Sequence, residues 1–138
     1  MKNLNIALLC CLLAIPSMGF TRDYYGAIYV DETTGIAGVV VNHETNDSAK
    51  KAALAQCKKK SGKKYCEFIS GWANSCSAAA WSPKNKSARR GDLSDNQKWV
   101  EKEAIAACKR AEGDRKCELV ATACTSWEVY EEITIWGP

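Results

Sequence analysis

The chain has 138 residues, 46% of them hydrophobic and 25% charged, with a formal net charge of +3. This length gives room for one domain, and so small a charge does not by itself indicate binding to nucleic acid or to a membrane surface. Eight cysteines and five tryptophans are many for one small domain, and the cysteine count bears on both the compartment and the disulfide pattern.

The first 19 residues have the pattern of a secretory signal peptide. Lys2 forms a short basic head, residues 6–15 are almost continuously apolar, and Ser17 and Gly19 place small residues before a cleavage point. The apolar run is shorter than the ~20 residues that a membrane-spanning helix needs. A buried N-terminal helix is the alternative interpretation, and Cys10 and Cys11 lie too early to indicate a lipid anchor.

Cleavage after Gly19 leaves 119 residues (138 less 19) and removes the charge of Lys2, so the formal charge falls from +3 to +2. The remaining chain, 20–138, has no second long apolar segment, so we expect no transmembrane segment after processing. The prediction is a secreted or periplasmic protein with a single domain.

A β-hairpin opens this domain. Residues 24–30 and 36–42 are rich in aromatic and branched side chains, which favour strands, and residues 31–35 have turn composition. Residues 39–41 are three valines, which indicates a strand covered on both faces. A first helix is predicted from the polar capping residues 45–48 to about Cys57.

The segment from Cys57 to Cys66 is predicted to be a lysine-rich loop, followed by a strand over 66–72 and a short strand over 77–81. Residues 82–92 are polar and contain Pro83, so we interpret them as a surface link between two halves.

A second helix follows, with Ser94 and Gln97 at the spacing of a capping box. Its predicted apolar face repeats that of the first helix. Strands are expected over 117–123 and, as a charged edge strand, over 127–136. The two helix faces consist of small and apolar residues: Ala49, Ala53, Leu54 and Cys57 in the first, and Val100, Ala104, Ile105 and Cys108 in the second.

Six cysteines remain after signal removal, and an even number in a short exported chain implies disulfides. They are Cys57, Cys66, Cys76, Cys108, Cys117 and Cys124. Cys57 and Cys66 are nine residues apart, as are Cys108 and Cys117, and each pair has a glycine five residues after its first cysteine. If these pairs form equivalent rings, Cys76 and Cys124 are left to join one half to the other. A zinc site is the alternative, but zinc ligand pairs are usually closer in sequence.

The predicted fold class is a small disulfide-stapled α+β domain, with two helices on an antiparallel sheet and an approximate internal duplication. A two-repeat solenoid is the alternative, although two repeats are rarely enough for stability.

Residues 24–124 resemble the bacterial family catalogued as domain of unknown function 4189. The resemblance rests on residues 25–28 (Tyr-Gly-Ala-Ile), the glycines of the hairpin, the alanine and leucine frame of 49–57, and Cys66 and Cys76. Ser77 stands where that family pattern has glycine. The resemblance implies export, small size and disulfides, and it transfers no catalytic residue.

Candidate catalytic groups are few. His43 is the single histidine, and we interpret it as a residue at the end of the hairpin because no activated nucleophile is near it in sequence. The acidic pairs at 31–32 and 131–132 have the composition of ordinary surface acids. Glu67 and Glu118 recur at the same place in both halves, and a local ion pair with the lysines is the simplest interpretation of Glu67.

The first loop carries a concentrated positive charge that the second loop, with Glu112 and Asp114, lacks. Its cations are Lys58, Lys59, Lys60, Lys63 and Lys64, extended by Lys84, Lys86, Arg89 and Arg90. A solvated loop is the alternative interpretation. For the tryptophans we expect Trp72, Trp81 and Trp127 to pack on the cystines of the core, and Trp136 to be exposed.

The sequence therefore predicts an exported, non-enzymatic domain that binds an envelope or extracellular macromolecule, most simply a protein, as an inhibitor, immunity factor or effector does. No catalytic residue, cofactor or metal is expected, nor is nucleic acid as the partner. The alternatives are a small hydrolase of envelope polymer with Glu67 or Glu118 as the acid, and attachment of the basic loop to anionic lipid or nucleic acid.

Overall fold

The computed structural model describes residues 23–125, and it has six strands and two helices in that range. The elements are β1 (Tyr25–Asp31), β2 (Ile36–His43), α1 (Asn46–Ser61), β3 (Glu67–Ala73), β4 (Cys76–Ser82), β5 (Ser87–Arg90), α2 (Gln97–Glu112) and β6 (Glu118–Cys124). The predicted α+β class with antiparallel strands is confirmed. The strands are divided between two sheets, ordered β2-β1-β3 and β5-β4-β6.

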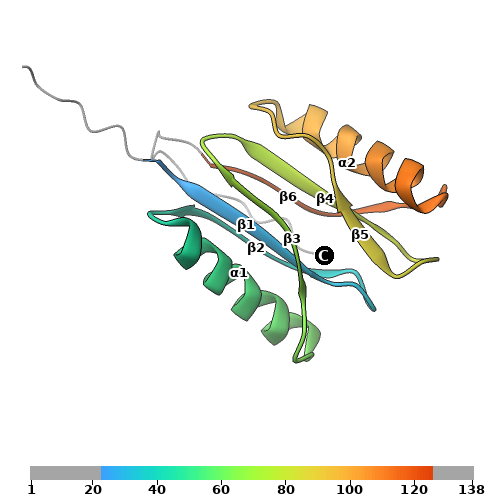
Figure 1. The fold of residues 1–138 in the computed structure, drawn as a ribbon, viewed down its shortest axis with the longest axis horizontal. Coiled ribbons are helices and arrows are strands. Elements are labelled where there is room, and N and C mark those ends of the chain that lie inside the picture. The colour runs from blue at the N-terminus through green and yellow to red at the C-terminus, as the bar shows by residue number, and fades with distance from the viewer. Residues whose placement is uncertain (1–22, 126–138) are drawn as a thin grey trace, which may run out of the picture.

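The two sheets face each other, and each carries one helix on its outer face (Figure 1). Alternation of side chains along the strands produces this layering. Ile28 and Val30 of β1 point into the core between the sheets, whereas Ala27 points to α1 and packs with Ala49 and Ala53. Small side chains under each helix allow the helix to lie close to its sheet.

The duplication is more complete than the sequence analysis expected. The interpretation of residues 82–92 as a surface link is wrong, because β5 lies in this segment and pairs with β4 as a second hairpin. Each half is therefore hairpin, helix and strand, with the third strand paired to the first. Equivalent residues stand 51 positions apart, as Cys57 and Cys108 do.

The helix ends follow local chemistry. Both helices are capped at the N-terminus by a side chain, Thr45 for α1 and Asn96 for α2, and both end at a glycine in the left-handed conformation, Gly62 (φ 67°) and Gly113 (φ 60°). The predicted capping box of Ser94 is wrong, since Asn96 is the cap. α1 also continues a full turn beyond the predicted end, because lysine favours helix and complements the negative C-terminal end of the helix dipole.

The three expected disulfides are present: Cys57–Cys66, Cys108–Cys117 and Cys76–Cys124. The first two, here called the first ring and the second ring, each tie the end of a helix to the start of the next strand. The expected role of the third is wrong. Cys76 and Cys124 are register partners on β4 and β6, inside the second half, so this bond does not join the halves.

Trp72 and Trp81 are buried in the core between the sheets, 3% and 8% exposed. They do not pack in the cluster of the Cys76 cystine, contrary to expectation, because Trp81 and Cys76 point to opposite faces of β4. The predicted signal peptide (1–19), the predicted strand over 127–136 with its two acids, and Trp127 and Trp136 all lie outside the described residues.

Candidate binding surface

The lysines of the first ring are exposed, but they do not form one loop as predicted. Lys58, Lys59 and Lys60 occupy the last turn of α1, and only Lys63 and Lys64 follow the helix cap in the loop. Within residues 23–125, no carboxylate lies within ion-pair distance of any of these five ammonium groups. The structure therefore brings the predicted cations together and gives them no internal ion pair.

The acids of the second ring, Glu112 and Asp114, are bonded internally. The Glu112 carboxylate lies 2.6 Å from the Arg89 guanidinium and accepts a hydrogen bond of 3.0 Å from the Asn85 amide, which lowers the pKa of Glu112. Asp114 is buried and accepts hydrogen bonds from the Ser82 hydroxyl (2.7 Å) and the Lys116 main-chain N–H (2.9 Å). These donors hold the pKa of Asp114 below its ordinary value, against the opposing effect of burial.

The equivalent positions in the first half carry an acid and a base, with the acid on the hairpin and the base in the ring. Asp31 occupies the position of Ser82, and Lys63 occupies that of Asp114. Burial alone would raise the pKa of Asp31, but hydrogen bonds from Thr33 and Thr34, with a smaller contribution from the charge of Lys63, keep it below its ordinary value. The Asp31 carboxylate is thus hydrogen-bonded within its own turn, and it accepts no hydrogen bond from the first ring.

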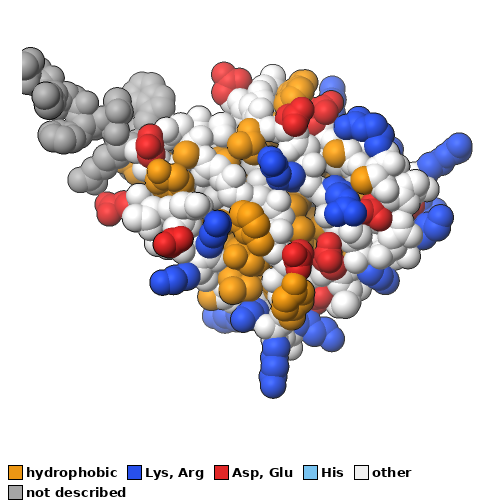
Figure 2. All heavy atoms as spheres, viewed as in Figure 1, with side chains coloured by type: hydrophobic (Ala, Val, Ile, Leu, Met, Phe, Trp, Pro, Cys, Tyr) orange, Lys and Arg blue, Asp and Glu red, His pale blue; other side chains and the backbone are white. Residues whose placement is uncertain are grey.

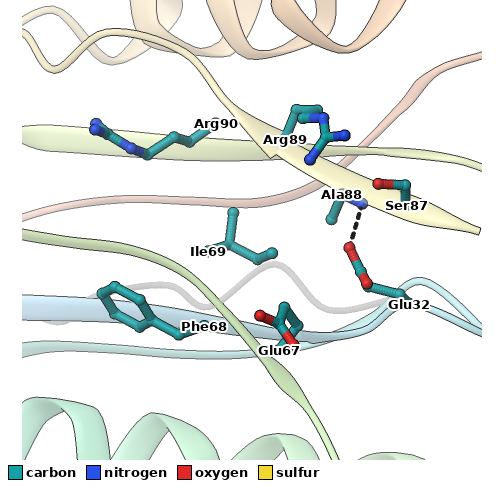
Figure 3. A pocket seen from close by; sticks show the side chains of 8 residues that line it. All are labelled: Glu32, Glu67, Phe68, Ile69, Ser87, Ala88, Arg89 and Arg90. Atoms are coloured by element: carbon teal, nitrogen blue, oxygen red, sulfur yellow. Dashed lines mark hydrogen bonds between the residues drawn. The ribbon is translucent and has the colours of Figure 1, made fainter. Parts of the chain in front are cut away.

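A shallow cleft of about 380 Å³ lies beside the first ring, between β3 of one sheet and β5 of the other (Figure 3). Its lining is made of short segments of both strands and the adjoining turn: Glu32, Glu67, Phe68, Ile69, Ser87, Ala88, Arg89 and Arg90. Both acids of the cleft are engaged. Glu32 accepts a hydrogen bond from the Ala88 main-chain N–H (2.9 Å), as the dashed line in Figure 3 marks, and Glu67 accepts one from the Tyr65 hydroxyl.

The predicted ion pair between Glu67 and a lysine is therefore wrong, and the nearby carboxylate instead raises the pKa of Tyr65. Glu118, its counterpart on β6, is exposed. Glu67 shares the cleft with Glu32, and each of these two carboxylates accepts a hydrogen bond from an internal donor, whereas Glu118 does not line the cleft.

Two aromatic side chains beside the cleft are exposed, Tyr65 by 71% and Phe68 by 41%. The Phe68 ring lies 5.3 Å from the Tyr29 ring, and the Lys50 ammonium lies 4.8 Å from its centroid, so the ring is held in place. Figure 2 shows hydrophobic side chains gathered where β3 crosses this face, with acidic and basic side chains around them. We call the five lysines, Tyr65 and Phe68 the first-ring surface.

His43 lies at the end of β2, as predicted, with Nδ1 3.1 Å from the Ser48 hydroxyl. That hydroxyl donates its proton to the Thr45 carbonyl oxygen (3.0 Å), so the imidazole acts as the donor to Ser48. This is the reverse of the proton transfer that would activate a serine nucleophile. The pair supports the start of α1.

The profile of the protein family described as "Domain of unknown function (DUF4189)" matches residues 25–124, which is most of the chain. The chain belongs to the DUF4189 family. Its match begins at β1 and ends at β6, so it coincides with the two folded halves. No curated protein and no solved structure matches this DUF4189 chain significantly. Neither helix among the described residues is long and apolar enough to cross a membrane.

Sequence reasoning identified the five lysines and the glutamates that follow the two rings, Glu67 and Glu118, but it missed the cleft and Phe68. The cleft arises only when the two sheets pack face to face, which brings residues from 67–69 beside those from 87–90. Phe68 and its counterpart Leu119 are both exposed on edge strands, but an apolar residue in a strand carries no sequence signal of its exposure.

Proposed function

We propose that this DUF4189 protein is exported to an oxidising compartment, secreted or periplasmic, and acts as a non-enzymatic domain that binds another protein through its first-ring surface. The partner surface is acidic. The class includes inhibitors, immunity factors and effectors. Three disulfides support the compartment, because such bonds persist where glutathione and thioredoxin do not reduce them.

The observation that carries the proposal is the contrast between two equivalent rings. The second ring has its acids bonded to Arg89, Asn85 and Ser82, as folding stability would favour. The first ring leaves five cations without an ion pair among the described residues, next to two exposed aromatic rings. The helix dipole accounts for lysines in the last turn of α1, but it does not account for Lys63 and Lys64 beyond the cap, whereas binding of an acidic partner accounts for all five.

Aromatic groups are enriched at the centre of protein–protein contacts and polar groups lie at the rim, so here the exposed rings take the centre and the lysines the rim. Complementary charges increase the rate of encounter and select the partner. The rigid frame keeps the entropy loss on binding small, because the ring joins the end of α1 to the start of β3.

The test is photo-crosslinking capture with the full chain, exported and processed by its own cells, followed by titration of the purified partner. One variant carries K58Q, K59Q, K60Q and K64Q. Its matched control carries K109Q, R110Q, R115Q and K116Q, which removes the same four charges from the second ring. We expect affinity to fall about tenfold or more in the first variant at low salt, and to change little in the control.

Equal losses in both variants would mean that net charge, and not the first ring, governs binding. Full capture by the first variant would contradict the proposal. Circular dichroism of both variants provides the check that the fold is intact.

A further inference from the structure

The edge of β3 is free for pairing on the side that faces the cleft. β3 pairs with β1 on one side only, and β5 pairs with β4 on one side only. Within residues 23–125, the main chain of β3 is bonded to β1, and outside that pairing its one further hydrogen bond comes from the Ser75 hydroxyl to the carbonyl oxygen of Ala73, at the end of the strand (3.2 Å). A row of unpaired N–H and C=O groups on a seven-residue strand is a template for another strand.

The edge of β5 is occupied. The carboxylate of Glu32 accepts the Ala88 N–H in the place where a neighbouring strand would put a carbonyl oxygen. β5 has only four residues, and the Glu32 carboxylate already bonds one of its N–H groups, so little of the β5 edge is left for pairing. Pairing in the cleft is therefore directed to β3, while β5 contributes side chains.

Cations outnumber acids around this edge. Arg90 is exposed, and Lys50 lies over Phe68, and neither has an ion pair among the described residues, as is also true of the five lysines of the first ring that precedes β3. Glu32 and Glu67 keep their negative charges, because the Ala88 N–H and the Tyr65 hydroxyl that bond them are neutral donors. A segment with acidic side chains complements this arrangement, and a basic one does not.

Phe68 and Ile69 supply an apolar contact next to the free edge. Phe68 is 41% exposed although Tyr29 and Lys50 hold its ring, so a partner side chain covering it gains hydrophobic burial without ordering the ring first. Side chains of an added strand would alternate between the α1 side, where Phe68 meets Lys50, and the cleft side, where Ile69 and Arg90 lie.

We infer that the β3 edge binds an extended, acidic segment of the partner protein as an added strand, with an apolar side chain on Phe68 and a carboxylate on Arg90. This inference rests on the proposed function and specifies its geometry. The main chain of β3 provides affinity, and the alternation of apolar and acidic side chains provides selectivity.

The experiment uses a fluorescent peptide of alternating valine and glutamate, about as long as β3, titrated into the full processed protein. Two further peptides serve as probes of mechanism: one with lysine in place of glutamate, and one with a central proline, which removes a main-chain N–H. We expect the glutamate peptide to bind at least about tenfold more tightly than either of them.

Matched variants locate the site. F68A and R90E are expected to weaken binding of the glutamate peptide about tenfold, whereas L119A and R115E, which change an exposed residue of the same kind in the second half, leave it unchanged. Amide hydrogen exchange measured by NMR is expected to slow at β3 and not at β6 when the peptide is bound.

The outcomes separate the inference from the function on which it rests. Equal binding of the three peptides, or binding that F68A and R90E do not change, overturns the added strand. Partner capture by F68A and R90E at full strength, with loss in the quadruple lysine variant, also overturns the β3 edge but leaves the proposed function standing. Capture that no first-ring variant affects contradicts the proposed function itself.

Discussion

The two halves of the molecule have the same order of elements but different rings. In the second ring the sequence Glu112-Gly-Asp114 gives two carboxylates that bind the β4–β5 hairpin. In the first ring the same positions are Ser61-Gly-Lys63, which carry no carboxylate. The comparison shows that two copies of one repeated unit share a fold while differing in how the acidic and basic side chains of their rings are used.

A second difference lies in the sheets. Cys76 and Cys124 are bonded at the end of the second sheet, and the equivalent positions in the first sheet, Tyr25 and Ala73, are register partners without a covalent bond. The second half therefore has two disulfides and the first half has one. We expect the second half to be the more stable part of the domain.

Removal of the Cys76–Cys124 bond is expected to cause the largest loss in the free energy of unfolding. It spans 48 residues, against nine for each ring. In the chain-entropy model, serine at both positions lowers the free energy of unfolding by about 4 kcal/mol, and serine at Cys57 and Cys66 by about 2.5 kcal/mol. Urea unfolding followed by tryptophan fluorescence measures both, and a smaller loss for the longer bond would contradict the ranking.

Helix packing is expected to be equally tight in both halves, and glycine substitutions test this. A Cβ atom at Gly38 would collide with main-chain atoms of Ala53 and Cys57, and one at Gly91 would collide with those of Ala104. Alanine at Gly38 or Gly91 is therefore expected to cost about 1–3 kcal/mol.

The control for these two substitutions is Gly71→Ala, where the nearest atom is the end of the Phe68 ring at 3.2 Å. A contact of 3.2 Å is relieved by a shift of a few tenths of an ångström, unlike the main-chain collisions at Gly38 and Gly91, so the control is expected to cost about 1 kcal/mol or less. Clearly unequal losses at Gly38 and Gly91 would show that one helix lies more loosely on its sheet.

The smallest expected effect depends on pH and belongs to the second ring. The pKa of Asp114 in the folded protein lies below its ordinary value of 3.8, so its carboxylate stabilises the fold above about pH 3.8, and this contribution is lost as the pH falls through the lowered value. Asp114→Asn is expected to lower the urea midpoint at neutral pH, and the gap to the wild-type protein should close in acid.

The matched control for Asp114 is Asp92→Asn, which changes an exposed acid before α2. Its urea midpoint should follow that of the wild-type protein across the same pH range. A gap for Asp114→Asn that stays constant into strong acid would mean that lost packing, and not lost charge, causes the destabilisation.

Signals confined to a few residues were sufficient to predict both helices, five of the six strands and the disulfide pairs. Gly62 and Gly113 mark the helix ends because left-handed backbone favours glycine. β5 was missed because it is an edge strand of four residues with Ala88 as its one buried side chain, so it has almost no apolar pattern. The repeat itself contained the missing information, since a hairpin before α1 implies one before α2.

The candidate site was only partly accessible to sequence reasoning. The lysines are neighbours in sequence, so their cluster could be predicted from composition. The placement of Arg90 opposite Ile69 depends on how two sheets stack, which no local pattern specifies. The bonds that Glu112 and Asp114 form could not be predicted from local sequence either, because their partners Arg89 and Ser82 lie more than 20 residues earlier in the chain.

No disulfide among the described residues crosses from one half to the other, since the bonds are confined to 57–66, 76–124 and 108–117. The halves are held together by the core of Ile28, Val30, Trp72 and Trp81, and by the short connector after β3. A single unit on its own would expose this apolar sheet face to water. A chain made of one such unit would therefore need a second copy to cover that face, as the subunits of a homodimer do, and the second half takes this place within one chain.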